Sequence, residues 1–209
     1  MPGKPHKTPV TSEHRPDQQG LDRITFFSDG VFAIAITLLA LEIRLPVPTV
    51  NLNDDELATA LVAIWPKYMS FLISFLVIGF FWISHHRKFH FILRYDKTLI
   101  FLNLLLLMVI AFIPFPTTVL SEYGNRTATI FYALVIILGG LISMVTWLYA
   151  SHHNRLTDPQ MDAKQRRNEI LIPAVTMGIF LLSIGLAYID ANLARTSWIL
   201  IAVVNAFLR

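Results

Sequence analysis

The chain of 209 residues is 55% hydrophobic and only 15% charged, with a mean hydropathy of +0.57 and a formal net charge of +3. Soluble domains are about 25% charged, so this composition indicates an integral membrane protein and argues against a nucleic-acid-binding protein. The chain has no cysteine, which excludes disulfides, thiolate metal sites and a cysteine nucleophile.

Residues 1–22 contain several prolines and no apolar run. We therefore expect a disordered, weakly basic tail and no cleavable signal peptide. The remaining residues, 23–209, are predicted to form one transmembrane domain, because no linker to a second domain is visible.

Six hydrophobic segments follow the tail, and we interpret each as a helix that spans the membrane, for which about 20 residues are needed. The loops between them are short, so neighbouring helices are expected to be antiparallel. The prediction is an all-α integral membrane protein with six transmembrane helices per subunit, at residues 24–43, 60–84, 98–120, 128–150, 169–189 and 196–208.

Lys and Arg residues are distributed unequally between the two sides of these predicted spans. Thirteen of the 17 fall in the tail, in the second and fourth of the five connections, and at Arg209. Three fall on the other side, at Arg44, Arg126 and Arg195. Because basic residues accumulate in cytoplasmic loops, we predict a multi-pass protein of the cell membrane with both termini cytoplasmic.

Asp29 lies near the start of the first span, among Phe, Val, Ile and Leu residues. A carboxylate is costly there unless it is paired, so it is either an ion or proton site or a structural group that pairs across the bundle. Arg23 lies six residues back, too far for a partner one turn away, so we favour a structural pair with another helix. The candidate partners are Trp82, His85, His86 and Asn103.

At 100° per residue, one face of the first span carries Ile34, Thr37, Leu38 and Leu41. Such a stripe fits a helix that lines a narrow, partly dewetted pore. It also fits an ordinary packed face, since any span rich in Ile and Leu has one. Both interpretations stay open at the level of residue pattern.

The segment from Trp82 to His90 is rich in histidine, with His86 and His90 at a helical metal-ligand spacing. No cysteine and no third ligand accompany them, so we predict no metal site. A basic helix end at the membrane interface is the simpler interpretation, and a pH-responsive role stays open because imidazole titrates near neutrality.

Pro114 and Pro116 lie near the non-cytoplasmic end of the third span. Two prolines cannot both continue a regular helix, so the span should kink or end there. A helix terminus is the simpler expectation at this position.

The motif Arg23-x-x-x-Phe27-Ser28-Asp29-Gly30, followed by Val-Phe-Ala-Ile-Ala-Ile-Thr-Leu-Leu, resembles the prokaryotic branch of the lysosomal potassium channel family, transmembrane protein 175. Other stretches that are similar to this family are Phe81-Trp82-x-x-His85-His86, Asn103-Leu104-x-Leu106-Leu107 and Pro114-Phe115-Pro116-Thr117. The resemblance covers the first three predicted helices, and the last three fit by hydropathy only.

The resemblance implies a potassium-selective channel without a conventional filter loop, assembled as a homotetramer whose first helices line a central pore. The isoleucine that forms the family's constriction corresponds to Ile34, with Leu38 and Leu41 as further apolar rings and Thr37 as a hydroxyl layer. Potassium is then the permeant ion, the bilayer is the surrounding medium, and no cofactor is implied.

The resemblance also implies a polar network that holds the first helix in place. Its members in this chain are Arg23, Ser28, Asp29, Trp82, His85 and Asn103. The sequence lacks a Walker motif, a Gly-x-Ser-x-Gly elbow and a His-Glu-x-x-His pair, so we do not expect an enzyme.

Two other classes of function compete with a potassium channel. A proton-conducting protein or secondary transporter would use Asp29 with His85 and His86 as carriers. A structural or regulatory membrane protein would transport nothing. Currents that reverse near the potassium equilibrium potential separate the channel from both.

Overall fold

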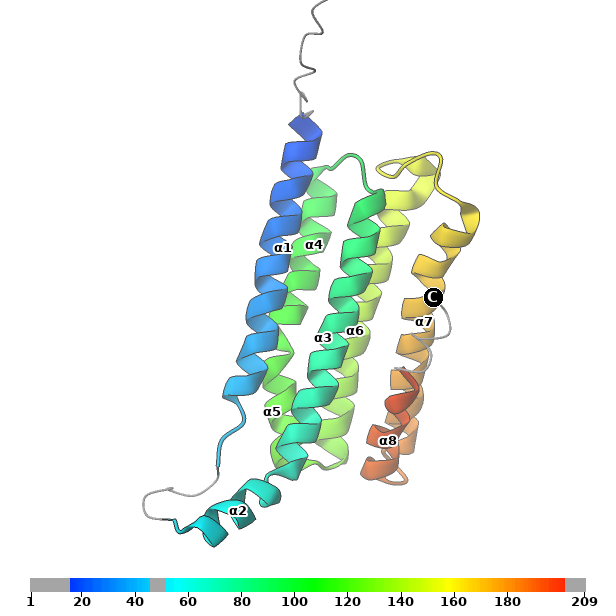
Figure 1. Ribbon diagram of the computed structural model, residues 1–209. Coiled ribbons are helices and arrows are strands. Elements are labelled where there is room, and N and C mark those ends of the chain that lie inside the picture. Colours follow the sequence, from blue (N-terminus) through cyan, green and yellow to red (C-terminus); the bar gives the residue numbers. More distant parts are fainter. Residues whose placement is uncertain (1–15, 46–51, 202–209) are drawn as a thin grey trace, which may run out of the picture.

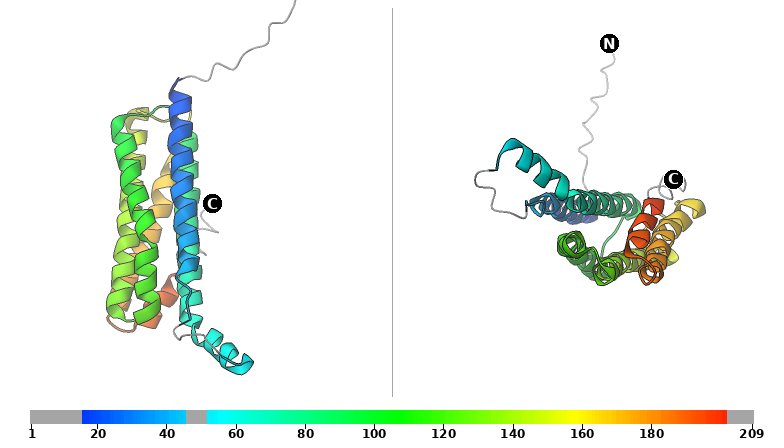
Figure 2. Two further views of the ribbon diagram at one scale, coloured as in Figure 1. Left: turned by 90° about the vertical axis from the view of Figure 1, so that its left-hand side faces the viewer. Right: turned by 90° about the horizontal axis from the view of Figure 1, so that it is seen from below.

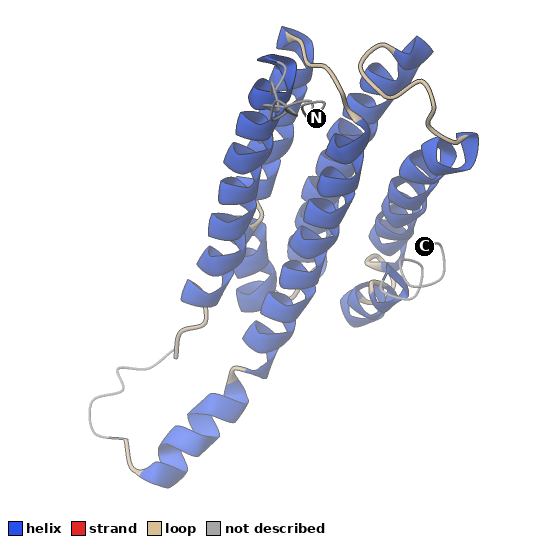
Figure 3. Cartoon of the chain, turned by 45° about the horizontal axis from the view of Figure 1, so that its top comes forward, coloured by secondary structure: helices blue, strands red, loops and turns tan. Residues whose placement is uncertain are grey.

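A computed structural model describes residues 16–45 and 52–201, and these residues form helices and loops (Figures 1 and 3). In chain order the helices are α1 (Pro16–Leu41), α2 (Asp54–Ala63), α3 (Trp65–Phe91), α4 (Lys97–Phe112), α5 (Pro114–Tyr123), α6 (Arg126–Ser151), the 3₁₀ turn η1 (His152–Asn154), α7 (Ala163–Leu186) and α8 (Ala191–Ser197).

The long helices form two layers. Figure 2 shows α1 and α3 side by side in one layer and α4, α5 and α6 in the other, with α7 and α8 beyond α6. Helix α2 extends away from the bundle, and none of its residues is buried. The layered bundle leaves one side of α1 uncovered, which becomes important for the site.

Five helical segments of the described residues are long and apolar enough to cross a membrane: Asp17–Leu41, Trp65–Phe91, Lys97–Tyr123, Arg126–Asn154 and Ala163–Leu186. The prediction of an all-helical, multi-span protein is confirmed to that extent. Helix α8 begins at Ala191, before the expected sixth span, and residues 202–208 of that span lie outside the described part of the chain.

Two predicted helix starts are earlier in the structure. Helix α1 begins at Pro16, so residues 16–22 are helical rather than part of the predicted tail, while residues 1–15 are outside the described ranges. Helix α7 begins at Ala163 because the Asp162 side chain accepts from the Lys164 N–H and caps the helix. Hydropathy detects the apolar core of a span and misses such polar first turns.

The second span covers Trp65–Phe91 and not residues 60–84. Residues 54–63 instead form the separate helix α2, which starts with a reciprocal capping box between Asn53 and Glu56. Pro66 then occupies the first turn of α3, where its missing N–H costs no helical hydrogen bond. Consequently the segment from Trp82 to His90 belongs to the last turns of a helix.

The third predicted span is divided at its prolines, as expected: α4 ends at Phe112 and α5 begins at Pro114. Ile113 keeps right-handed helical angles (φ −53°, ψ −37°), and the Thr117 N–H bonds to its carbonyl at 3.1 Å. Pro114 and Pro116 lie in the first turn of α5, where they do not need to donate. Helix α5 ends only at Gly124, whose positive φ of 54° suits glycine.

A polar contact joins three elements in the middle of the apolar core. Ser74 Oγ lies 2.8 Å from Thr117 Oγ1 and 3.0 Å from the Tyr132 hydroxyl, and all three side chains are buried. The Tyr132 ring stacks on Trp198 with centroids 5.1 Å apart. These contacts fix α3 against α5 and α6, and bring the chain after α8 onto the same core.

We call the end of the bundle where α1 begins and α3 ends the basic end (the top of Figure 1). There the loop after α3 bonds to the loop after α6: the Leu93 N–H donates to the Leu156 carbonyl at 2.8 Å, and the Asp158 N–H donates to the Phe91 carbonyl at 3.0 Å. These main-chain bonds hold the two layers together at this end.

Candidate pore helix and its anchoring contacts

Helix α1 has a buried side and an exposed side. Ser28, Phe32, Ala35 and Leu39 recur every three or four residues and are almost fully buried against the bundle. The exposed side carries the residues that the sequence analysis singled out for the pore: Ile34 (61% exposed), Leu38 (40%), Leu41 (62%) and Thr37.

Asp29 is held by the indole of Trp82. The Trp82 Nε1–H donates to Asp29 Oδ1 at 2.9 Å, and the indole stacks on the His86 ring with centroids 5.6 Å apart. Of the four candidate partners, Trp82 is thus the one that bonds to the carboxylate. A charged acceptor makes such a hydrogen bond stronger than a neutral pair, so this contact ties α1 to α3.

A second contact chain runs through the buried interior. Asn103 Nδ2 donates to Ser28 Oγ at 2.9 Å, and Asn103 Oδ1 lies 2.9 Å from His85 Nε2. Because the amide oxygen is an acceptor, His85 Nε2 must carry the proton and donate. Ser28 Oγ in turn donates to the Ile24 carbonyl at 2.8 Å. This series of hydrogen bonds therefore connects α3, α4 and α1, and each group donates to the next, from His85 to the Ile24 carbonyl.

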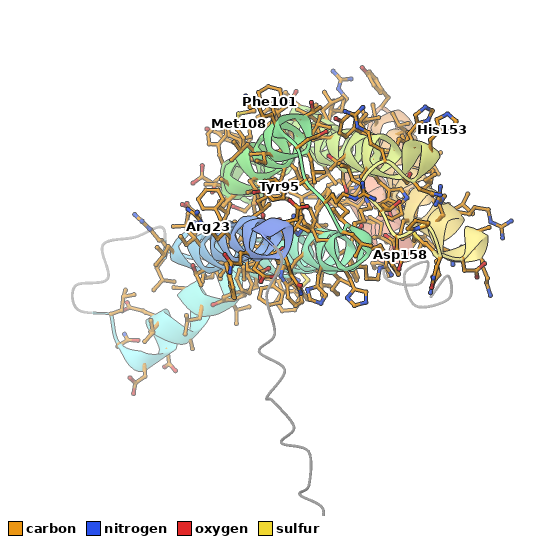
Figure 4. The ribbon with its side chains drawn as sticks, turned by 90° about the horizontal axis from the view of Figure 1, so that it is seen from above. Arg23, Tyr95, Phe101, Met108, His153 and Asp158 are labelled. Carbon is orange, nitrogen blue, oxygen red and sulfur yellow. The ribbon has the colours of Figure 1, made fainter. Side chains whose placement is uncertain are left out.

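Arg23 does not join either group. It lies on the exposed surface of α1, which Figure 4 shows from the basic end, and no hydrogen bond or ion pair within residues 16–45 and 52–201 links it to the other five. Five of the six residues implied by the resemblance thus form two separate contact groups, and the sixth, Arg23, stands apart from both in the isolated subunit.

Lys88 is a polar residue of the interior that the sequence analysis did not single out. It is buried, and its Nζ donates to Ser143 Oγ at 2.7 Å and to the Ser143 carbonyl at 3.2 Å. Next to it, Arg87 Nε lies 2.9 Å from Glu169 Oε1. The sequence does contain a signal for this buried position, because Lys88 lies three residues after His85. In a helix that continues to Phe91, this spacing puts Lys88 on the same inward side of α3.

Asp96 caps α4 at the basic end, outside the spans. It accepts from the Leu99 N–H at 2.9 Å, from the Tyr149 hydroxyl at 2.5 Å and from Arg155 Nη2 at 3.3 Å. Partial burial alone would raise the pKa of this carboxyl, but the hydrogen bonds from Tyr149 and Leu99 and the charge of Arg155 outweigh it, and the pKa of Asp96 is lowered.

His86 and His90 do not gather further ligands. Within the described ranges no three His, Asp or Glu side chains are grouped as a metal site would require. The ring of His86 instead contacts Trp82, and the ring of His90 contacts Phe91. The side chains of the two histidines are thus engaged with neighbouring aromatic rings.

Comparison with known proteins gives the same class of molecule as the fold. A family model described as the endosomal/lysosomal potassium channel TMEM175 matches residues 23–114. A potassium channel of Streptomyces collinus is 39% identical over 190 residues, which covers 88% of this chain and 91% of that protein. The endosomal/lysosomal proton channel TMEM175 of Danio rerio is 27% identical over 190 residues, 89% of this chain and 36% of that protein.

Solved structures are similar as well. The crystal structure of a lysosomal potassium-selective channel TMEM175 homolog from Chamaesiphon minutus superposes with a TM-score of 0.79 at 31% identity, and covers 92% of this chain and all of that chain.

Fold and matches together define a helical integral membrane protein of the channel class, not an enzyme. This chain belongs to the TMEM175 family. The match includes the whole of the first-helix motif that carries Ser28 and Asp29, and the family implies no cofactor.

Proposed function

We propose that the chain is the subunit of a homotetrameric, potassium-selective channel in which four α1 helices surround a central pore. The observation that carries this proposal is the exposed side of α1. It combines Ile34, Thr37, Leu38 and Leu41 in a chain of the TMEM175 family whose relative in Streptomyces collinus is named a potassium channel.

The exposed stripe has the composition that a filter-less pore needs. Ile34 to Leu41 covers about 10 Å along the helix axis, so the three apolar side chains would stack as rings one turn apart. A narrow ring of four branched side chains excludes water and forms a barrier to hydrated ions. Ile34 is the proposed constriction because it follows the Ser-Asp-Gly motif by one turn.

Thr37 supplies the polar layer of the proposed pore. Its Oγ1 donates to the Ile34 carbonyl of the same helix at 2.8 Å. The hydroxyl hydrogen is therefore occupied within the helix, and the oxygen lone pairs are left for a cation. Four such oxygens would replace part of the hydration shell, which costs less for potassium than for a smaller, more strongly hydrated cation.

Small residues on α1 support close approach of a second copy. Among the described residues, and apart from the neighbouring backbone of α1 itself, no heavy atom lies within 4 Å of the position that a Cβ on Gly30 would occupy, and Ala33 is exposed one turn further on. Small residues at helix surfaces allow backbones in a membrane to pack closely. We assign this part of α1 to contacts between subunits.

The two contact groups on the other side of α1 would set its rotation. Asp29 bonds to Trp82 on α3, and Ser28 bonds to Asn103 on α4. A rotation of α1 about its axis would break both bonds, so the stripe can face the pore only while they are made. These residues are therefore proposed as anchors of the pore helix and not as ligands of the ion.

The proposed orientation puts the basic end in the cytoplasm, because basic residues accumulate in cytoplasmic loops. It depends on the predicted sixth span at residues 196–208, of which residues 202–208 lie outside the described part of the chain. Both termini would then be cytoplasmic in a cell membrane.

Proton conduction is the second candidate. The observations that favour it are that the Danio rerio relative is named a proton channel and that Asp29 and His86 both lie at the exposed edge between α1 and α3, against Trp82. A proton pathway would use these two groups as carriers.

Ion flux from liposomes tests the proposal. Purified protein in potassium-loaded liposomes should release potassium when a protonophore balances the charge, and sodium-loaded liposomes should release far less. Flux that requires a pH gradient and is equal for both cations would instead support proton conduction. Silent liposomes with correctly inserted tetramers would contradict both.

A further inference from the structure

Helices α3, α6 and α7 border a pocket that is separate from the exposed side of α1. Its enclosed and open space together amount to about 590 Å³. Most of its wall is apolar, with Val77 and Phe81 from α3, Ile136 from α6, and Ile172 and Phe180 from α7. We call this pocket the α3–α7 slot.

The polar residues of the slot include three at its end toward the basic end of the bundle: Ser84, Arg87 and Ser143. Ser84 Oγ is buried and has no hydrogen-bond partner among the described residues. An unmade hydrogen bond at a buried hydroxyl costs about 1–3 kcal/mol, so a group that accepts from Ser84 would be stabilised there. Thr176, deeper in the slot, already donates to the Ile172 carbonyl.

The charged residues at or behind this end of the slot carry more positive than negative charge, and of them only Arg87 is in the wall of the slot. Arg87 pairs with Glu169, and the Lys88 ammonium bonds to Ser143, which is in the wall of the slot. The two ion pairs with N···O distances within 4.0 Å among the described residues, Arg87–Glu169 and Arg155–Asp96, do not include Lys88. Arg87, Lys88 and Glu169 together have a formal charge of +1. An excess cation at membrane depth is costly, which favours an anionic ligand over a neutral or cationic one.

We propose that the slot binds an anionic phospholipid from the leaflet at the basic end. One acyl chain lies between α3 and α7 along the apolar wall, and the phosphate group accepts from Arg87 and Ser84. The apolar length and the charged end match the two parts of this amphiphile, and a guanidinium binds phosphate with good geometry. The site does not depend on which ion the channel conducts.

The test uses the purified full-length protein in a neutral detergent. Phosphatidylglycerol and phosphatidylcholine with identical acyl chains are added separately, and binding is read by native mass spectrometry and by the shift in apparent Tm. We expect phosphatidylglycerol to remain bound and to raise the Tm, and phosphatidylcholine to do so at least tenfold more weakly in apparent affinity.

Three variants and one control variant locate the binding. Arg87→Gln should weaken phosphatidylglycerol binding about tenfold, whereas Arg94→Gln, in an exposed loop at the same end, should not change it. Ser84→Ala should raise the Tm without lipid, because it removes the unpartnered hydroxyl, and should reduce the lipid-dependent shift. Thr176→Phe fills the slot without touching Arg87, and should abolish the shift.

Equal binding of the two lipids, or equal effects of Arg87→Gln and Arg94→Gln, would overturn the proposal. If Arg87→Gln does not fold, Ser84→Ala and Thr176→Phe test the site in its place. Unchanged lipid binding in both of these variants would overturn the proposal. Ile201 lines the slot at the end of the described chain. Lipid binding that appears only after deletion of residues 202–209 would show that the chain fills its own slot, and would also overturn the proposal.

Discussion

Replacing Asn103 by leucine should destabilise the subunit, and replacing His85 by phenylalanine in the same chain should restore most of the loss. Asn103 is 2% exposed and makes two interhelical hydrogen bonds, to Ser28 and to His85. Such bonds in membrane proteins contribute about 0.6 kcal/mol each. The single variant also leaves the His85 Nε2–H without an acceptor, which costs about 1–3 kcal/mol more.

These contributions give a loss of about 3 kcal/mol for Asn103→Leu, or a fall of about 6–12 °C in apparent Tm for a chain of this size. In the double variant the unpartnered donor is gone, and the phenylalanine keeps the ring contacts that His85 makes with Phe89 and Phe32. Ser28 still donates to the Ile24 carbonyl. We therefore expect the double variant to lie within about 1 kcal/mol of the wild type.

The assay is thermal unfolding of all four proteins (wild type, both single variants and the double variant) in one detergent, followed by tryptophan fluorescence. The double-variant cycle isolates the coupling between positions 85 and 103. A double variant whose loss equals or exceeds the sum of the single losses would refute the claim that the hydrogen bond, rather than packing volume, makes this contact stabilising.

Asp29→Asn should lower tetramer stability more than it alters the potassium-to-sodium permeability ratio, because a neutral amide accepts the indole hydrogen bond more weakly; an intact tetramer with changed ion preference would contradict this. The partners that lower the pKa of Asp96 stabilise the fold at pH values above the ordinary pKa of 3.8, and this contribution is lost as the pH falls through the lowered pKa. Asp96→Asn should therefore make the fall in Tm between about pH 5 and about pH 3 less steep. Gly140→Ala should destabilise the protein in a thermal melt, since its new methyl would lie 2.7 Å from Met177, whereas Gly178→Ala, with nothing within 4 Å, should be neutral or stabilising.

The sequence predicts the number and order of the first five spans well, because hydropathy follows directly from composition. It misplaces the start of the second span, since Ala60 to Ile64 are apolar and continue the pattern into α3. The signals for the break were local: the Asn53/Glu56 capping box and the proline after Trp65. Capping chemistry is invisible to a hydropathy average.

The partner of Asp29 could be narrowed to a few residues but not chosen from the sequence. Trp82, His85 and His86 all lie within about one turn of each other, and the rotation of α3 in the bundle decides which of them faces α1. That rotation is set by packing of Ile78 and Val77 against the core. The same tertiary effect hides the contact between Lys88 and Ser143, which depends on a helix end that the sequence placed too early.

The reversal potential in mixed potassium and sodium solutions tests the central claim most directly, with wild type beside Ile34→Asn. Leu181→Asn, on the exposed surface of α7, is the matched control. The account predicts that Ile34→Asn raises conductance and moves the potassium-to-sodium permeability ratio toward one, while Leu181→Asn leaves both unchanged. Unchanged conductance and an unchanged ratio in Ile34→Asn would contradict a pore constriction at Ile34.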